Sequence, residues 1–154
     1  MAAYVLDTSA VVKRYIQEAG TVWVRSIADP AASHLIYLAR ITDVEVTSAV
    51  VRRQRGGNLS APDAAATLTQ FRQDLIQGYR IIEITPALLS VARSLAERHG
   101  LRAYDAVQFA AAVELNAQWV AAGTGTITLV SADQELNAAA QAEGLSVEDP
   151  NLHP

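Results

Sequence analysis

Short apolar segments that alternate with helix-forming stretches constrain the fold of this chain more than any other feature. Strands are expected over residues 4–6, 34–38, 80–84 and 126–130, with a short edge strand at 146–147. Helical periodicity and capping residues occupy the intervals between them. No hairpin-type dipeptide joins one strand to the next, and strands connected through helices pair in parallel. The pattern therefore predicts an α/β fold, a three-layer α/β/α domain around a four- to five-stranded parallel sheet.

Recognisable start and stop residues delimit the helices. Gly56-Gly57 should end the helix after the second strand, and the next helix should run from Ser60 to Gly78. The inner face of the helix after the second strand is expected to carry Ile41, Val44, Ser48 and Val51. The other helices are expected at 9–16, 21–28, 86–99 and 103–116, and from near Asp133 onward.

The composition is typical of one folded domain, expected to span residues 1–154. The chain has 154 residues, of which 51% are hydrophobic and 18% charged, so it can bury enough apolar surface to offset the entropy lost on folding. It contains no cysteine, which excludes disulfides, thiolate metal sites and cysteine nucleophiles. The net charge of −4 argues against holding nucleic acid by bulk electrostatic attraction.

Neither a secretory signal nor a membrane span is expected. The N-terminal segment has no basic region and reaches Asp7 before an apolar stretch could form. Residues 115–132 are uncharged, but polar residues and glycines interrupt them. We therefore expect a cytoplasmic protein.

Four acidic residues follow expected strands or begin expected helices. Asp7 comes directly after the first strand and Asp133 just after the fourth, while Glu45 and Asp105 lie in the first turns of helices. Because the carboxyl ends of parallel strands meet at one edge of a sheet, these carboxylates should converge there. Oxygen ligands without histidine or thiolate suit Mg²⁺ or Mn²⁺.

Each acid taken alone could instead serve a helix start. Asp7 could be an N-cap, and Asp105 lies where the helix dipole favours an anion. Thr42-Asp43-Val44-Glu45 and Ser131-Ala132-Asp133-Gln134 both fit capping boxes. Four carboxylates gathered at one edge would repel one another unless a cation neutralised them, which favours the metal interpretation.

A carboxylate-bound divalent ion activates water for in-line attack at phosphorus. The reaction predicted from the acids is therefore hydrolysis of a phosphodiester bond without a covalent enzyme intermediate.

Four segments together resemble one known family. They are Val5-Leu6-Asp7-Thr8-Ser9, Ile41-Thr42-Asp43-Val44-Glu45-Val46, the stretch 102–112 with sequence RAYDAVQFAAA, and Val130-Ser131-Ala132-Asp133-Gln134-Glu135-Leu136. Their order and spacing resemble the PIN-domain ribonucleases, and within them the VapC toxins of bacterial and archaeal type II toxin–antitoxin systems.

The resemblance implies a fold, an activity and a set of site residues. It implies a PIN-like sheet and a Mg²⁺- or Mn²⁺-dependent endoribonuclease acting on RNA, with a homodimeric state and a cognate antitoxin protein as partner. The implied metal-binding and catalytic acids are Asp7, Glu45, Asp105 and Asp133. The implied supporting hydroxyls are those of Thr8, Ser9 and Ser131.

Arginines near these segments are candidates for contacts to RNA phosphates. They are Arg14, Arg52, Arg53 and Arg102. Arginines at helix ends also complement the helix dipole or remain solvated, so a purely structural role stays open for them.

Two other functions are kept as alternatives. One is a non-cleaving RNA- or protein-binding module with the same fold. The other is a phosphate-switched signalling domain, which is disfavoured because strand three ends at Ile84-Thr85 without an acceptor aspartate or a later lysine.

Overall fold

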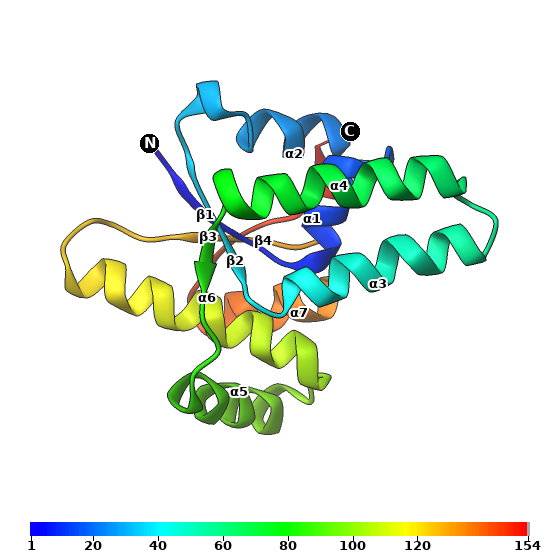
Figure 1. Cartoon of the computed structure of the whole chain (residues 1–154). Coiled ribbons are helices and arrows are strands. Elements are labelled where there is room, and N and C mark those ends of the chain that lie inside the picture. The colour runs from blue at the N-terminus through cyan, green and yellow to red at the C-terminus, as the bar shows by residue number, and fades with distance from the viewer. Residues whose placement is uncertain (154) are drawn as a thin grey trace.

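Five parallel strands form the central sheet of the computed structural model, which describes residues 1–153 (Figure 1). Their order is β3-β2-β1-β4-β5, and every neighbouring pair is parallel. The strands are β1 (Ala3–Leu6), β2 (Leu35–Ala39), β3 (Arg80–Ile82), β4 (Thr128–Val130) and β5 (Ser146–Glu148). The predicted parallel α/β sheet is confirmed, with β3 and β4 each two residues shorter than expected.

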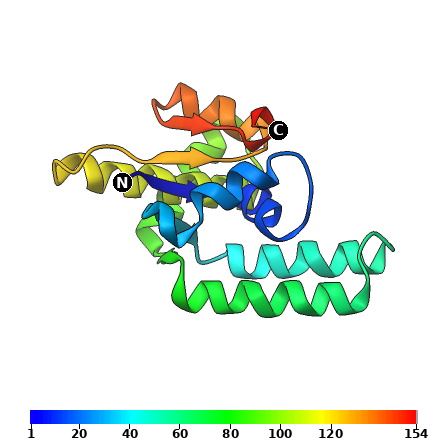
Figure 2. The same ribbon diagram turned by 90° about the horizontal axis from the view of Figure 1, so that it is seen from above.

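Helices cover both faces of the sheet (Figures 1 and 2). The helices on one face are α1 (Thr8–Tyr15), α2 (Thr21–Ile27), α3 (Thr42–Arg55) and α4 (Ala61–Gln77). Those on the other face are α5 (Pro86–His99), α6 (Ala103–Ala121) and α7 (Gln134–Ala142). Short 3-10 helices occupy Pro30–Ala32 and Pro150–Leu152. Figure 2 shows α3 and α4 side by side as a helical hairpin that extends beyond the sheet.

Each strand contributes alternate side chains to two separate cores. Val5 of β1 packs in the cluster that contains Phe109 of α6, whereas its neighbour Leu6 packs in the cluster that contains Phe71 of α4. All four of these side chains are fully buried. Successive side chains of a strand point to opposite faces, so a strand covered on both sides is apolar throughout, as β1 is.

The order in which strands are added to the sheet reverses between β1 and β4. From β1 it continues outward through β2 to β3, and from β4 it continues to β5 on the other side. Right-handed crossovers in opposite directions place the helices on opposite faces. The helices that follow β1 and β4 therefore diverge, which opens a crevice at the carboxyl ends of these two strands.

The buried face of α3 differs from the prediction. Val44 is 64% exposed and Ser48 is also exposed, while Thr42, Val46 and Val50 are buried. Two stripes at helical spacing run along α3, and the stripe through Val46 and Val50 is the one that packs in the core beside Val11.

Helix α6 is longer than predicted. It continues to Ala121 instead of ending near Asn116, and Gly123 follows with a left-handed φ of 69°. A glycine in this conformation commonly terminates a helix, whereas a single asparagine does not. Among the helices within residues 1–153, none is both long enough and apolar enough to cross a membrane.

Candidate active site

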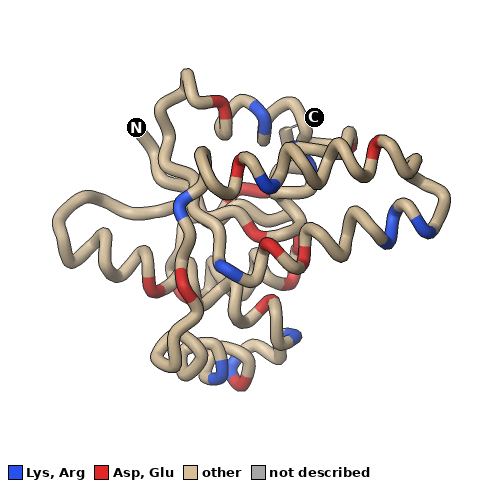
Figure 3. The backbone as a smooth tube through the Cα atoms, viewed as in Figure 1, with Lys and Arg blue, Asp and Glu red and all other residues tan. Residues whose placement is uncertain are grey.

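The four predicted acids line one pocket of about 330 Å³. Asp7 lies between β1 and α1, Glu45 on α3, Asp105 on α6, and Asp133 immediately before α7. In Figure 3 acidic positions gather near the centre of the molecule, where α3 begins. Segments far apart in the sequence thus present carboxylates to one hollow at the carboxyl ends of β1 and β4.

Asp7 is the most buried of these acids, with 4% exposure. Its Oδ1 accepts hydrogen bonds from the Ser9 hydroxyl at 2.6 Å and the backbone N–H of Ala10 at 2.9 Å. Its Oδ2 accepts one from the Ser131 hydroxyl at 2.6 Å. Burial raises the pKa of Asp7 to about 6, although these three hydrogen bonds favour the carboxylate and lower it.

Ser131 connects the first and last acids of the site. It is fully buried, its hydroxyl donates to Asp7, and its Oγ accepts the backbone N–H of Asp133 at 3.0 Å. Asp133 in turn accepts the N–H of Leu136 and caps α7. Asp7 caps α1 in the same way, so both acids cap a helix in addition to their place in the pocket. The capping box expected from Ser131 to Gln134 is wrong, because Asp133 itself is the N-cap of α7.

Glu45 is held by a buried glutamine. Gln108, which is 2% exposed, donates from Nε2 to Glu45 Oε1 at 2.8 Å. The same nitrogen lies 2.9 Å from Thr42 Oγ1 and 3.2 Å from Thr8 Oγ1. The capping box expected at Thr42 is wrong, because the N-cap of α3 is Ile41 and it makes no side-chain cap bond.

Asp105 lies among other negative charges. Partial burial raises its pKa, and the neighbouring carboxylates of Asp133 and Glu45 raise it further, while the Arg102 guanidinium opposes the increase. Such mutual repulsion between carboxylates is relieved when a cation lies among them.

The oxygen donors of this pocket fit a hydrated divalent ion. Within residues 1–153, no three acidic or histidine side chains approach closely enough to form a complete ligand set by themselves. Mg²⁺ characteristically keeps several waters and takes only one or two carboxylates, so it does not need a closed protein cage. The pocket contains neither imidazole nor thiolate, which disfavours zinc.

The candidate arginines occupy different places. Arg53 lines the acidic pocket, and Arg52 lines an adjoining hollow of about 450 Å³ that also contains Tyr104. Arg102 is the N-cap residue of α6, near Asp105. Arg14 points elsewhere, because its guanidinium donates to the Tyr79 hydroxyl at 2.8 Å and pairs with Asp74 at 3.4 Å. The structure therefore does not place Arg14 with the acids.

Three polar or charged pocket residues were not among the predicted site residues. Lys13 and Glu18 line the pocket together with Gln108. Lys13 follows Ser9 by four residues and Gln108 follows Asp105 by three, so helical spacing places each on the face of an expected site residue. Glu18 had no such signal, because it lies in the connection between α1 and α2.

One hollow of the molecule is much larger than the acidic pocket. It measures about 1350 Å³ and lies along the outer edge of β3 and beside the C-terminal half of α6. Tyr37, Ile82 and Trp119 are among its lining residues, and its only acids are Glu83 and Glu114. Size therefore does not identify the site here, whereas the concentration of buried polar groups does.

Comparison with known families identifies the class of protein. A model of the PIN domain family matches residues 4–142. This chain belongs to the PIN domain family, which confirms the resemblance seen in its sequence. The sequence has no significant match among curated proteins.

Several solved structures share the fold of this chain. FitAcB from Neisseria gonorrhoeae is 20% identical, with a TM-score of 0.65 over 96% of this chain and 97% of that one. VapBC2 from Rickettsia felis, solved with a DNA fragment from its promoter, is 16% identical, with a TM-score of 0.64 over 96% and 98%. VapC20 from Mycobacterium tuberculosis, a toxin that cleaves the sarcin–ricin loop, is 19% identical, with a TM-score of 0.60 over 88% and 94%.

Proposed function

We propose that this protein is a divalent-metal-dependent endoribonuclease that hydrolyses RNA phosphodiester bonds. The observation that carries the proposal is the shared pocket of Asp7, Glu45, Asp105 and Asp133, which come from four separate parts of the chain. Membership of the PIN domain family supports a nuclease. RNA as the substrate is supported by the similarity of fold to a toxin that cleaves the sarcin–ricin loop.

Asp7, Glu45, Asp105 and Asp133 would hold Mg²⁺ or Mn²⁺ in this proposal. When bound, the ion supplies an activated water and stabilises negative charge on the phosphate oxygens. Ser9 and Ser131 orient the Asp7 carboxylate through their hydrogen bonds. The Nε2 of Gln108 holds the Glu45 carboxylate by a hydrogen bond, and the same nitrogen also contacts the Thr8 hydroxyl. Asp7 and Glu45 thereby face the pocket in defined orientations before substrate arrives.

We further propose that the protein is the toxin of a toxin–antitoxin pair. The supporting observations are the resemblance of its sequence segments to the VapC toxins and the similarity of its fold to VapC20, which is named a toxin. A cognate antitoxin protein, a homodimeric state and a cytoplasmic location belong to this proposal. Arg52, Arg53 and Arg102, which lie in or beside the pocket, are the proposed contacts to RNA.

Single-residue variants with matched controls test the nuclease. Purified protein should cleave single-stranded RNA with Mg²⁺ or Mn²⁺ and lose this activity with a chelator. Asp7→Asn and Asp105→Asn should reduce cleavage by more than the roughly 10–100-fold typical of losing an outer-shell partner. Asp63→Asn, an exposed position on α4, is the matched control and should cleave like the wild type.

Calorimetric titration with Mn²⁺ separates cleavage from the alternative of a non-cleaving binding module. If the protein is a metal-dependent nuclease, the titration should show heat of Mn²⁺ binding, and Asp105→Asn should weaken that binding. RNA binding without Mn²⁺ binding and without cleavage would overturn the nuclease and favour the binding module. Cleavage unchanged in both site variants would instead overturn the assignment of Asp7 and Asp105 to the site.

A further inference from the structure

The acidic pocket also contains two cationic side chains, and their ion pairs involve none of the four proposed metal-binding acids. Lys13 of α1 and Arg53 of α3 both line the pocket, and Lys13 is only 6% exposed. Burying a lysine ammonium is costly unless an anion accompanies it. The accompanying anion is Glu18, whose Oε1 lies 3.5 Å from Lys13 Nζ and whose Oε2 lies 3.7 Å from an Arg53 guanidinium nitrogen.

The Glu18 carboxylate thus bridges two cations of the pocket with its two oxygens. Both separations exceed the 2.7–2.9 Å typical of a charge-assisted hydrogen bond. The two ion pairs of Glu18 are therefore longer than the ion pairs that the same two cations could form with a better-placed anion. All three groups line the same hollow as the four acids.

The segment that carries Glu18 is fixed by its own backbone. The N–H of Glu18 donates to the Thr21 hydroxyl at 2.9 Å, and that hydroxyl donates to the Ile16 carbonyl at 3.2 Å. Gly20 has a φ of 85° and lies tightly against Pro150. Glu18 is therefore held beside the cations by an ordered loop, and movement of its side chain alone can free them.

We propose that Lys13 and Arg53 form a binding subsite for a backbone phosphate of RNA, which Glu18 fills until the substrate displaces it. A phosphate carries negative oxygens that two converging cations can bind at shorter range than Glu18 allows, and arginine suits planar, two-pronged contacts to it. The subsite adjoins the carboxylates, so it would hold a phosphate next to the one being hydrolysed. This inference rests on the proposed function for the identity of its ligand.

Binding of a fluorescent oligouridylate in the presence of Ca²⁺ tests the subsite, with gel analysis to establish that the RNA stays intact. Lys13→Met and Arg53→Met should each weaken binding by about tenfold, as expected for one charge-assisted contact. Each should also reduce the slope of log affinity against log salt by about 0.7, the value for one phosphate contact on a single strand.

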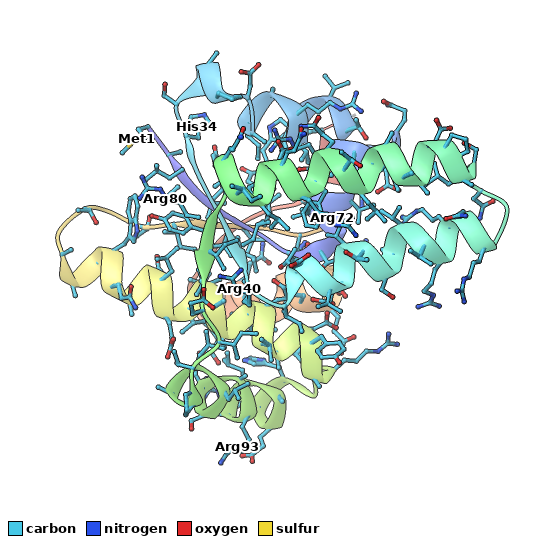
Figure 4. The ribbon with its side chains drawn as sticks, in the orientation of Figure 1. Met1, His34, Arg40, Arg72, Arg80 and Arg93 are labelled. Carbon is cyan, nitrogen blue, oxygen red and sulfur yellow. The ribbon has the colours of Figure 1, made fainter. Side chains whose placement is uncertain are left out.

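Exposed residues of α5 provide matched controls. Arg93→Met removes the same charge, and Figure 4 shows Arg93 directed away from the molecule on α5. Glu18→Gln should tighten binding several-fold because it removes the competing anion, whereas Glu97→Gln, which makes the same change at another exposed site on α5, should not. The gain from Glu18→Gln should disappear in the Glu18→Gln/Lys13→Met double variant.

Circular dichroism and thermal unfolding check that the variants fold. If Lys13→Met unfolds, Arg53→Met, whose side chain is 34% exposed, still decides the outcome. Binding and salt slopes equal to those of Arg93→Met would overturn the subsite, as would a wild type that does not bind the oligouridylate. A Glu18→Gln variant that binds no tighter than the wild type would overturn the displacement.

The subsite and the proposed nuclease can fail separately. If the wild type cleaves RNA with Mg²⁺ while the variants bind like Arg93→Met, the subsite is wrong and the nuclease stands. If the variants lose binding as expected while no metal supports cleavage, the subsite stands and the nuclease is wrong.

Discussion

Gln108 donates a 2.8 Å hydrogen bond to Glu45, and the same amide nitrogen reaches the hydroxyls of Thr8 and Thr42. One buried side chain of α6 therefore ties together the beginnings of α1 and α3 at the pocket. Its Oε1 is buried without a hydrogen-bond partner among the described residues. All the described side-chain hydrogen bonds of this amide are therefore made by its nitrogen, one of them to Glu45.

Gln108→Met, which keeps the approximate size but removes the donor, should weaken Mn²⁺ binding and cleavage by about 10–100-fold, the range for an outer-shell partner. Calorimetry and a cleavage assay measure the two effects. Thermal unfolding should show a stability near that of the wild type, because the change also removes the unpaired Oε1. Wild-type metal affinity in this variant would show that Glu45 needs no such support.

Ser131→Ala should change the pH dependence of cleavage more than the maximal rate of cleavage. The Ser131 hydroxyl donates to Asp7 and lowers the pKa of that carboxyl, which burial raises to about 6. Without the donor the pKa rises further, so the acidic limb of the pH profile moves to higher pH. At pH 6 we expect about a 10-fold or greater loss of cleavage, with a smaller loss at pH 8. An equal loss at both pH values would contradict this role for Ser131.

The sequence is sufficient to predict the framework of the site. Val5 and Leu6 are followed directly by Asp7, so an apolar strand delivers an acid to the carboxyl edge of the sheet, as observed. The parallel sheet follows from helices between all strands. These features depend on local periodicity, which a single sequence contains.

Contacts that depend on tertiary placement could not be predicted in the same way. The two stripes of α3 are equally helical in spacing, and only packing in the core selects Val46 over Val44. The approach of Glu18 to Lys13 depends on a loop that Pro150, near the other end of the chain, helps to fix. The position of Arg14 away from the acids depends on tertiary placement as well, because its partner Asp74 lies on α4.

Asp7 should make the metal-free protein less stable as pH rises. Its folded-state pKa of about 6 exceeds the unfolded value near 3.9, so the native state binds more protons between these two pH values. The free energy of unfolding should therefore fall by about 3 kcal/mol from below pH 4 to above pH 6 through this group alone. Asp7→Asn removes this dependence and should be the more stable protein at pH 8, with the advantage lost near pH 4.

Urea unfolding across this pH range, in the presence of a chelator, checks the expectation for Asp7. Wild type and Asp7→Asn should converge at low pH and separate as pH rises. Parallel curves for the two proteins would show that Asp7 is not held with a raised pKa. Mg²⁺ should then stabilise the wild type more than Asp7→Asn, because only the folded wild type presents the complete set of carboxylates.

Gly20→Ala should destabilise the protein more than the same change at Gly57. Both glycines have left-handed φ values, 85° and 79°, so alanine costs about 1–2 kcal/mol at either position. At Gly57 the new Cβ would meet nothing within 4 Å, whereas at Gly20 it would lie 2.7 Å from the Pro150 carbonyl carbon. The backbone must shift there, so we expect a total loss of about 3–5 kcal/mol, at the upper end of single substitutions. Urea unfolding of both variants measures the difference, and equal losses would mean that the loop carrying Glu18 is not held against Pro150.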